Sequence, residues 1–254
     1  MDATTLNEKL KSTGKGFQEH EEKYFLEGPR SRLRELLFVI KIFFEFIRGF
    51  RILHFVGPCV SVFGSARTTS DSRFYKRAAS MGAGIAKLGF TVMTGGGPGI
   101  MEAANKGAKS SGGFSVGCNI KLPKEQQPNL FMDKYFTCEY FFVRKILMFK
   151  YSYAFVIMPG GIGTMDEFFE ALTLIQTRKI LDFPVILMGR QYWEPLMPLF
   201  DNMLEAGMID KKDLKYVLFT DSEEEALAHI NRFAKEKYHS RRQLLYKKFH
   251  LLAE

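Results

Sequence analysis

Three short stretches rich in small residues follow apolar runs, and two of them lead into helical patterns. They are Gly64-Ser65-Ala66-Arg67, Gly95-Gly96-Gly97-Pro98-Gly99 and Pro159-Gly160-Gly161-Ile162-Gly163-Thr164. Glycine lets a ligand approach the backbone, and the first turn of a following helix directs free N–H groups and a partial positive charge at an anion. Neither long stretch has the Gly-Lys-Ser/Thr of a Walker loop or the G-x-G-x-x-G pattern, which disfavours ATP hydrolysis and nicotinamide chemistry.

An acid follows the last of these stretches, in Thr164-Met165-Asp166-Glu167. The spacing matches a capping box, with Thr164 as N-cap and Glu167 as its partner three residues later. A second interpretation is catalytic, because a carboxylate beside a phosphate loop is repelled unless it faces positive charge on the same ligand. Cleavage of an N-riboside develops such charge on the ribose, and a carboxylate can stabilise it, attack it or activate water. Glu170 lies one turn further on the same helix, and we expect it to point into the same cleft.

Two adjacent cations, Arg144 and Lys145, interrupt an otherwise apolar helical pattern shortly before this loop. Adjacent helical residues point about 100° apart, so we expect at most one of the two to face the core. They are either two solvated charges on an amphipathic helix or a clamp for phosphate, for which the planar fork of arginine is suited.

The rest of the chain supplies the elements that position these residues. Apolar runs of four to six residues predict strands, listed here: 60–63, 90–94, 115–120, 154–158, 184–188 and 217–220. Helical patterns lie between them, near 72–88, 99–111, 141–151, 164–178, 192–205 and 222–237. This alternation predicts an α/β fold, a Rossmann-like doubly wound parallel sheet.

Further helices are expected at the two ends of the chain. Leu33, Leu36, Leu37 and Ile40 begin a helical apolar stripe over residues 31–50, preceded by a polar segment at 1–28. The tail at 240–252 has the pattern of a basic amphipathic helix. We therefore divide the chain into an N-terminal extension, 1–57, and a nucleotide-binding domain with the C-terminal helix, 58–254.

Composition narrows the classes of partner. The chain has 254 residues, a net charge of +8 and 25 phenylalanines, and this aromatic content suggests oligomer contacts as well as core. Its basic residues are not in one block with interleaved aromatics, as nucleic-acid binding would favour, and a positive net charge also suits a phosphorylated small molecule, so charge alone does not decide between them. Cys59, Cys118 and Cys138 are too scattered for a disulfide framework or a zinc site.

The segments that would mark export or membrane insertion are missing from the sequence pattern. The first residues lack the apolar core of a signal peptide, and no apolar run is long enough to span a bilayer. We expect a cytoplasmic homo-oligomer, a dimer or higher, that binds neither membrane nor nucleic acid and needs no metal or other cofactor.

Three motifs occur together in this sequence: the second glycine stretch with its continuation Ile100-Met101-Glu102-Ala103-Ala104-Asn105, the Arg144-Lys145 pair, and the P-G-G-x-G-T-x-x-E run from Pro159 to Glu167. Their combination resembles the LOG (Lonely Guy) family. The resemblance covers about residues 58–220 and is closest to the longer bacterial type. It implies a cytokinin riboside 5′-monophosphate phosphoribohydrolase acting on AMP or an N6-substituted AMP. The family was long mislabelled as lysine decarboxylases, and no lysine here lies in a pyridoxal phosphate motif. A non-catalytic nucleotide or molybdenum-cofactor carrier of the same fold is the alternative.

The resemblance also implies roles for individual residues. Glu167 corresponds to the catalytic acid and Arg144 to its catalytic partner. The implied substrate-binding residues are Gly160, Gly161, Gly163, Thr164, Asp166, Lys145, Gly64, Ser65, Arg67, Gly96, Gly97, Gly99, Glu125 and Thr173. Of these, Glu125 and Thr173 align only loosely with the family pattern.

Overall fold

The structure, a computed structural model, describes residues 31–122, 127–181 and 183–235. Its strands are β1 (Cys59–Phe63), β2 (Thr91–Thr94), β3 (Ser115–Ile120), β4 (Lys134–Cys138), β5 (Ser152–Ile157), β6 (Val185–Met188) and β7 (Val217–Thr220). They form one sheet in the order β4-β3-β2-β1-β5-β6-β7, and every neighbouring pair is parallel. The central strands β1, β2 and β6 are buried along their whole length, and β5 is buried at every residue except Tyr153, as expected for a parallel sheet covered on both faces.

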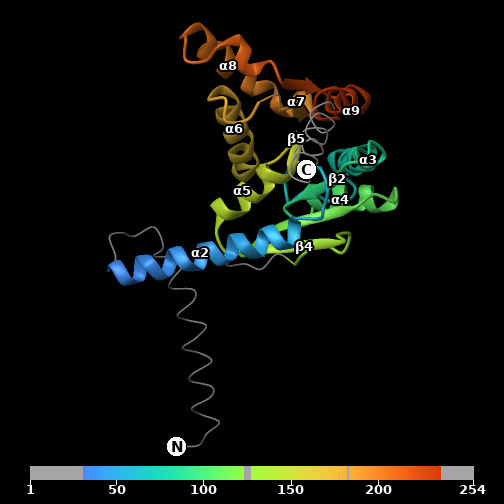
Figure 1. Cartoon of the computed structure of the whole chain (residues 1–254). Helices are drawn as coiled ribbons and strands as arrows, with labels where there is room; N and C mark the ends of the chain where they lie inside the picture. Colours follow the sequence, from blue (N-terminus) through green and yellow to red (C-terminus); the bar gives the residue numbers. More distant parts are fainter. Residues whose placement is uncertain (1–30, 123–126, 182, 236–254) are drawn as a thin grey trace, which may run out of the picture.

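Helices cover both faces of this sheet. Their bounds are α2 (Arg32–Leu53), α3 (Arg73–Lys87), α4 (Ile100–Ser110), α5 (Phe141–Tyr151), α6 (Ile162–Gln176), α7 (Arg190–Trp193), α8 (Met197–Glu205) and α9 (Glu223–Ile230). One buried apolar cluster joins the sheet to α3, α4 and α9, and the other joins it to α2, α5, α6 and α8 (Figure 1). The predicted Rossmann-like, doubly wound α/β fold is confirmed.

The prediction and the structure differ at three elements. The edge strand β4 was not predicted, because its sequence mixes exposed polar residues with buried ones. The helix predicted at 192–205 is broken into α7, a 3-10 turn at Glu194–Leu196 and α8. Prolines at the starts of the turn and of α8 explain the breaks, since proline lacks the N–H that a continuous helix would use. The helix predicted from Thr164 begins earlier, at Ile162.

The N-terminal helix α2 is longer than predicted and has two apolar faces. One face packs on α5 and β4, where Gly49 and Leu53 are buried. The other face is exposed and carries Leu33, Leu36, Leu37, Ile40, Phe43, Phe44 and Ile47. No helix within the described ranges is long and apolar enough to cross a membrane. The predicted polar segment at 1–28 and the predicted helix at 240–252 lie outside the described residues.

Candidate active site

The glycine loops meet where the strand order reverses. Successive strands proceed from β1 to β4 on one side of the sheet, and from β5 to β7 on the other, so the loops after β1 and β5 lie side by side. The Ser65 N–H donates to the Pro159 carbonyl (3.0 Å), and the Ile100 N–H donates to the Ser65 carbonyl (3.1 Å). The first loop therefore connects the other two at the place where open α/β sheets bind ligands.

The glycines of these loops serve different purposes. Gly99 has φ +69°, and a β-carbon there would collide with the backbone of Ser65 and Ala66, so packing between loops requires this glycine. A β-carbon at Gly161 or Gly163 would meet no atom within 4 Å, and neither residue has a positive φ. Because neither crowding nor backbone conformation requires glycine at these two positions, they leave the start of α6 open to a ligand.

The first turn of α6 differs from the predicted capping box. Gly161 is the N-cap, no side chain caps the helix, and Thr164 is already its third residue. The Thr164 side chain is buried and packs against Gly160. Glu167 consequently lies too far into the helix to cap it, and the capping-box interpretation of Glu167 is wrong.

Glu167 is a buried acid with an unsatisfied oxygen. Its residue is 4% exposed, and its Oε1 lies 3.9 Å from the Arg144 Nη1. Its Oε2 is buried without a hydrogen-bond partner among the described residues. Burial raises the pKa of the Glu167 carboxyl to about 7, although Arg144 and Lys145 act in the opposite direction. A carboxyl whose pKa lies near neutral pH populates both protonation states, so it is suited to act as a base, acid or nucleophile.

Arg144 connects three parts of the site. Its Nε donates to the Cys118 carbonyl on β3 (2.9 Å), and its guanidinium lies against Gly95, where any side chain would collide with it. Through Glu167 it also contacts α6. The arginine is therefore fixed in direction by β3 and the second glycine loop, and the Glu167 carboxylate lies at its far end.

Lys145 also faces α6, which corrects the expectation that at most one of the two cations is directed inward. Its Nζ lies 2.8 Å from an Asp166 oxygen and 2.5 Å from a Glu170 oxygen. Burial lowers the pKa of the Lys145 ammonium, but the hydrogen bonds to Asp166 and Glu170, together with the charges of Glu170 and Glu167, raise it overall. The side chains of Arg144 and Lys145 thus both reach acids of α6, and Glu170 forms an ion pair with Lys145.

A network of buried polar side chains forms hydrogen bonds with the second glycine loop. The Asn129 side-chain amide donates to the Gly97 carbonyl (3.1 Å) and to the Asn105 Oδ1 (3.0 Å), which also accepts from the Thr94 hydroxyl (2.6 Å). The Gly96 carbonyl accepts from the Asn129 backbone N–H (2.9 Å). Asn129 was not singled out from the sequence, because no local pattern links it to a loop some thirty residues earlier.

The remaining predicted residues lie at varying distances from Glu167. Gly64 and Ser65 are on the loop between the other two, and Arg67 on that loop is exposed, with its N–H donating to the Ser65 Oγ (3.1 Å). Thr173 is exposed, lies nearly two turns beyond Glu167 on α6, and donates to the Phe169 carbonyl, so the structure does not bring it to the carboxylate. Glu125 lies outside the described residues.

The assembled groups can bind an anion at the start of α6 and act on a bond that develops positive charge beside Glu167. The anion would accept hydrogen bonds from the N–H groups of the open first turn, and Arg144 and Lys145 add positive charge nearby. In the part of the chain that the structure describes, no cluster of three or more His, Cys, Asp or Glu side chains could hold a metal ion.

The chain is similar in sequence to known proteins. The model of a family described as possible lysine decarboxylase matches residues 101–230, which include Arg144, Lys145, Glu167 and the loop before α6. A Mycobacterium tuberculosis protein named cytokinin riboside 5′-monophosphate phosphoribohydrolase is 29% identical over 173 residues, covering 66% of this chain and 90% of that protein.

Two solved structures have a similar fold. A structural genomics target is 24% identical, with a TM-score of 0.53, over 69% of this chain and 99% of that chain. A molybdenum cofactor (Moco) carrier protein from Chlamydomonas reinhardtii is 27% identical, with a TM-score of 0.51, over 70% of this chain and 97% of that chain. The first likeness concerns the fold alone.

Proposed function

Since the chain belongs to the family described as possible lysine decarboxylase, the LOG family that its motifs resemble, we propose that it hydrolyses the N-glycosidic bond of a purine nucleoside 5′-monophosphate. The substrate is AMP or an N6-substituted AMP, and the products are the free base and ribose 5-phosphate. The observation that carries the proposal is the buried Glu167, paired with Arg144 and one turn into a helix whose first turn is open. The name of the mycobacterial relative supports it.

In this proposal the 5′-phosphate binds the N–H groups of the Pro159–Thr164 loop, with Lys145 adding charge. The ribose then lies over Glu167, and the bond between its anomeric carbon and the purine nitrogen breaks with both electrons leaving on the base. Glu167 either attacks the anomeric carbon or takes a proton from the water that does, and in each case one water is consumed. Arg144 holds the carboxylate in position and contacts the substrate.

The decarboxylase description of the family has no support in these residues. A lysine that forms a Schiff base with a cofactor must lose its proton, which a lowered pKa favours. Lys145, whose charge acts on Glu167, is instead paired with two acids that raise its pKa.

A carrier function is the second candidate, and one observation favours it. The Chlamydomonas carrier matches 70% of this chain at 27% identity. A carrier needs the phosphate loop, but it has no use for a buried carboxylate whose pKa is raised to about 7 beside an arginine. Incubation of the protein with a panel of nucleoside monophosphates separates the two functions. Release of base and ribose 5-phosphate supports hydrolysis, and tight binding without products supports a carrier.

The pH dependence of the reaction follows from Glu167. If the carboxylate is nucleophile or base, kcat/KM for AMP should rise with pH through about 7, the pKa of Glu167 in the free protein. Glu170 contributes to raising this pKa, so Glu170→Gln should move the midpoint downward. Initial rates measured from about pH 5.5 to 8.5 test this. A rate that falls through neutrality would assign Glu167 the role of an acid instead.

The exposed face of α2 supports the expected homo-oligomer. Its seven apolar side chains lie along one side of the helix and are each at least 40% exposed. An exposed apolar stripe of this kind is typical of a protein interface, and a second copy can cover it by a two-fold interface.

Substitution within this face should therefore lower the mass in solution. We expect Phe44→Glu to yield a smaller species than the wild-type protein in light scattering, because a charge would be buried at the interface. Met208→Glu is the matched control, since Met208 is 71% exposed and lies outside this face. A wild-type protein that is monomeric at micromolar concentration would refute the oligomer.

A further inference from the structure

We propose that Tyr192 is a positioning residue for the anion loop: its hydroxyl fixes the peptide between Gly160 and Gly161 so that the Gly161 N–H faces the bound phosphate. The observation is a hydrogen bond of 2.6 Å from the Tyr192 hydroxyl to the Gly160 carbonyl. The two residues lie 32 positions apart, one on α7 and one in the loop after β5. The identity of the anion as a 5′-phosphate rests on the proposed function.

The peptide that Tyr192 holds is one that needs an external constraint. A peptide unit is planar and trans, so its C=O and N–H point in opposite directions. Directing the Gly160 carbonyl toward Tyr192 therefore directs the Gly161 N–H to the other side. Glycine on both sides of the peptide widens the range of backbone angles open to it, and the β-position of Gly161 has no neighbour within 4 Å, although Gly160 packs against Thr164. The hydroxyl of Tyr192 is thus the contact that selects one orientation.

Tyr192 can exert this constraint because its own helix is firmly held. The neighbouring Trp193 is 1% exposed, packs edge-on against the Tyr192 ring (4.8 Å between centroids), and donates from Nε1 to the Met188 carbonyl (3.0 Å). Gly189, which begins α7 with φ +101°, lies so close to Pro159 that a β-carbon there would be 3.1 Å from its ring. The start of α7 is therefore packed directly on the anion loop.

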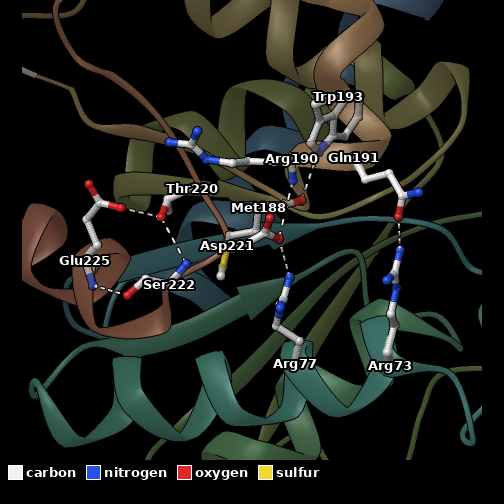
Figure 2. A network of polar contacts seen from close by, with 10 residues as sticks. All are labelled: Arg73, Arg77, Met188, Arg190, Gln191, Trp193, Thr220, Asp221, Ser222 and Glu225. Carbon is white, nitrogen blue, oxygen red and sulfur yellow. Dashed lines mark hydrogen bonds and ion pairs between the residues drawn. The ribbon is translucent and has the colours of Figure 1, made fainter.

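Polar contacts attach α7 to its other neighbours (Figure 2). Gln191 accepts from Arg73 at the start of α3 (2.8 Å), and the Arg190 N–H lies 3.4 Å from an Asp221 oxygen that also pairs with Arg77 (2.5 Å). These contacts join α7 to α3 and to the residue after β7. The frame that carries Tyr192 thus extends over three elements, none of which belongs to the loop.

Removal of the hydroxyl alone tests the proposal. In Tyr192→Phe we expect the Kd for ribose 5-phosphate, measured by calorimetry, to rise about 10-fold, since one hydrogen bond no longer fixes the donor. The KM for AMP should rise by a similar factor while kcat changes by less than about 3-fold. Adenosine lacks the phosphate, so Tyr192→Phe should change kcat/KM for adenosine no more than Tyr135→Phe does. Tyr135 is an exposed tyrosine on β4 and serves as the control.

Each result has a defined meaning. Unchanged affinity for ribose 5-phosphate in Tyr192→Phe would overturn the proposal, and so would an equal loss for AMP and adenosine, which indicates a general structural role. If the wild-type protein binds AMP without cleaving it, the hydrolytic function is refuted. The ratio of the AMP affinities of the wild-type protein and Tyr192→Phe then still decides the role of Tyr192. A wild-type protein that binds neither AMP nor ribose 5-phosphate would refute both.

Discussion

Replacement of Glu167 by glutamine should lower kcat for AMP by roughly 10³-fold or more, the scale expected for loss of a nucleophile or general base with its electrostatic contribution. Glutamine keeps the length of the side chain and a carbonyl oxygen but cannot carry the negative charge. AMP should bind at least as well as to the wild-type protein, because repulsion between the carboxylate and the phosphate is removed. Initial rates and AMP affinities on the same preparations measure both effects.

Stability provides the control for this substitution. The pKa of Glu167 is raised from 4.5 to about 7, so ionisation of the carboxyl destabilises the folded protein. The wild-type protein should lose stability as pH rises between these values, by up to about 3 kcal/mol, and stay at the lower level above them. Glu167→Gln lacks this loss and should melt higher than the wild-type protein at about pH 8, with little difference at about pH 5. A variant that is folded, more stable and still near wild-type activity would leave the catalytic group unidentified.

Dependence on the phosphate should be the second large effect. We expect kcat/KM for AMP to exceed that for adenosine by at least roughly 10²-fold, because binding energy from the phosphate positions the ribose over Glu167. Gly163→Val should remove most of this preference. The β-carbon of a residue in the first turn of a helix points toward the N-terminus of the helix, where the anion would lie.

The structure makes Gly163→Val a selective perturbation. A β-carbon at Gly163 meets no protein atom within 4 Å, and valine is no worse than glycine in a helix, so the melting temperature should change little. Turnover of adenosine should also be nearly unchanged. Equal rates for AMP and adenosine in the wild-type protein, or a Gly163→Val variant with full AMP activity, would remove the phosphate role from this loop.

Much of the fold was predictable from the sequence, because buried parallel strands are short apolar runs and their ends are marked by glycine. Where local pattern and tertiary context disagree, prediction failed. The strand β4 mixes exposed and buried residues at the edge of the sheet, and the capping-box spacing of Thr164 and Glu167 suggested an N-cap three residues later than Gly161.

The candidate site was predictable only in part, for a related reason. Glu167, Arg144 and the glycine loops lie in compact motifs, so their residue types and spacing were visible in the sequence. Contacts between distant segments were not, such as those of Asn129 with Gly97 and of Tyr192 with Gly160. The two cations on α5 show the same limit, since helical spacing gives the direction of a Cβ but not where a long side chain ends.

The most direct test of hydrolysis is incubation of the wild-type protein with AMP in the presence of a chelator, followed by chromatography of the products. We predict adenine and ribose 5-phosphate in equal amounts, many per protein molecule, with no requirement for a divalent ion. AMP that remains intact while bound to the protein, or turnover that stops with the chelator and returns with a metal ion, would contradict the account.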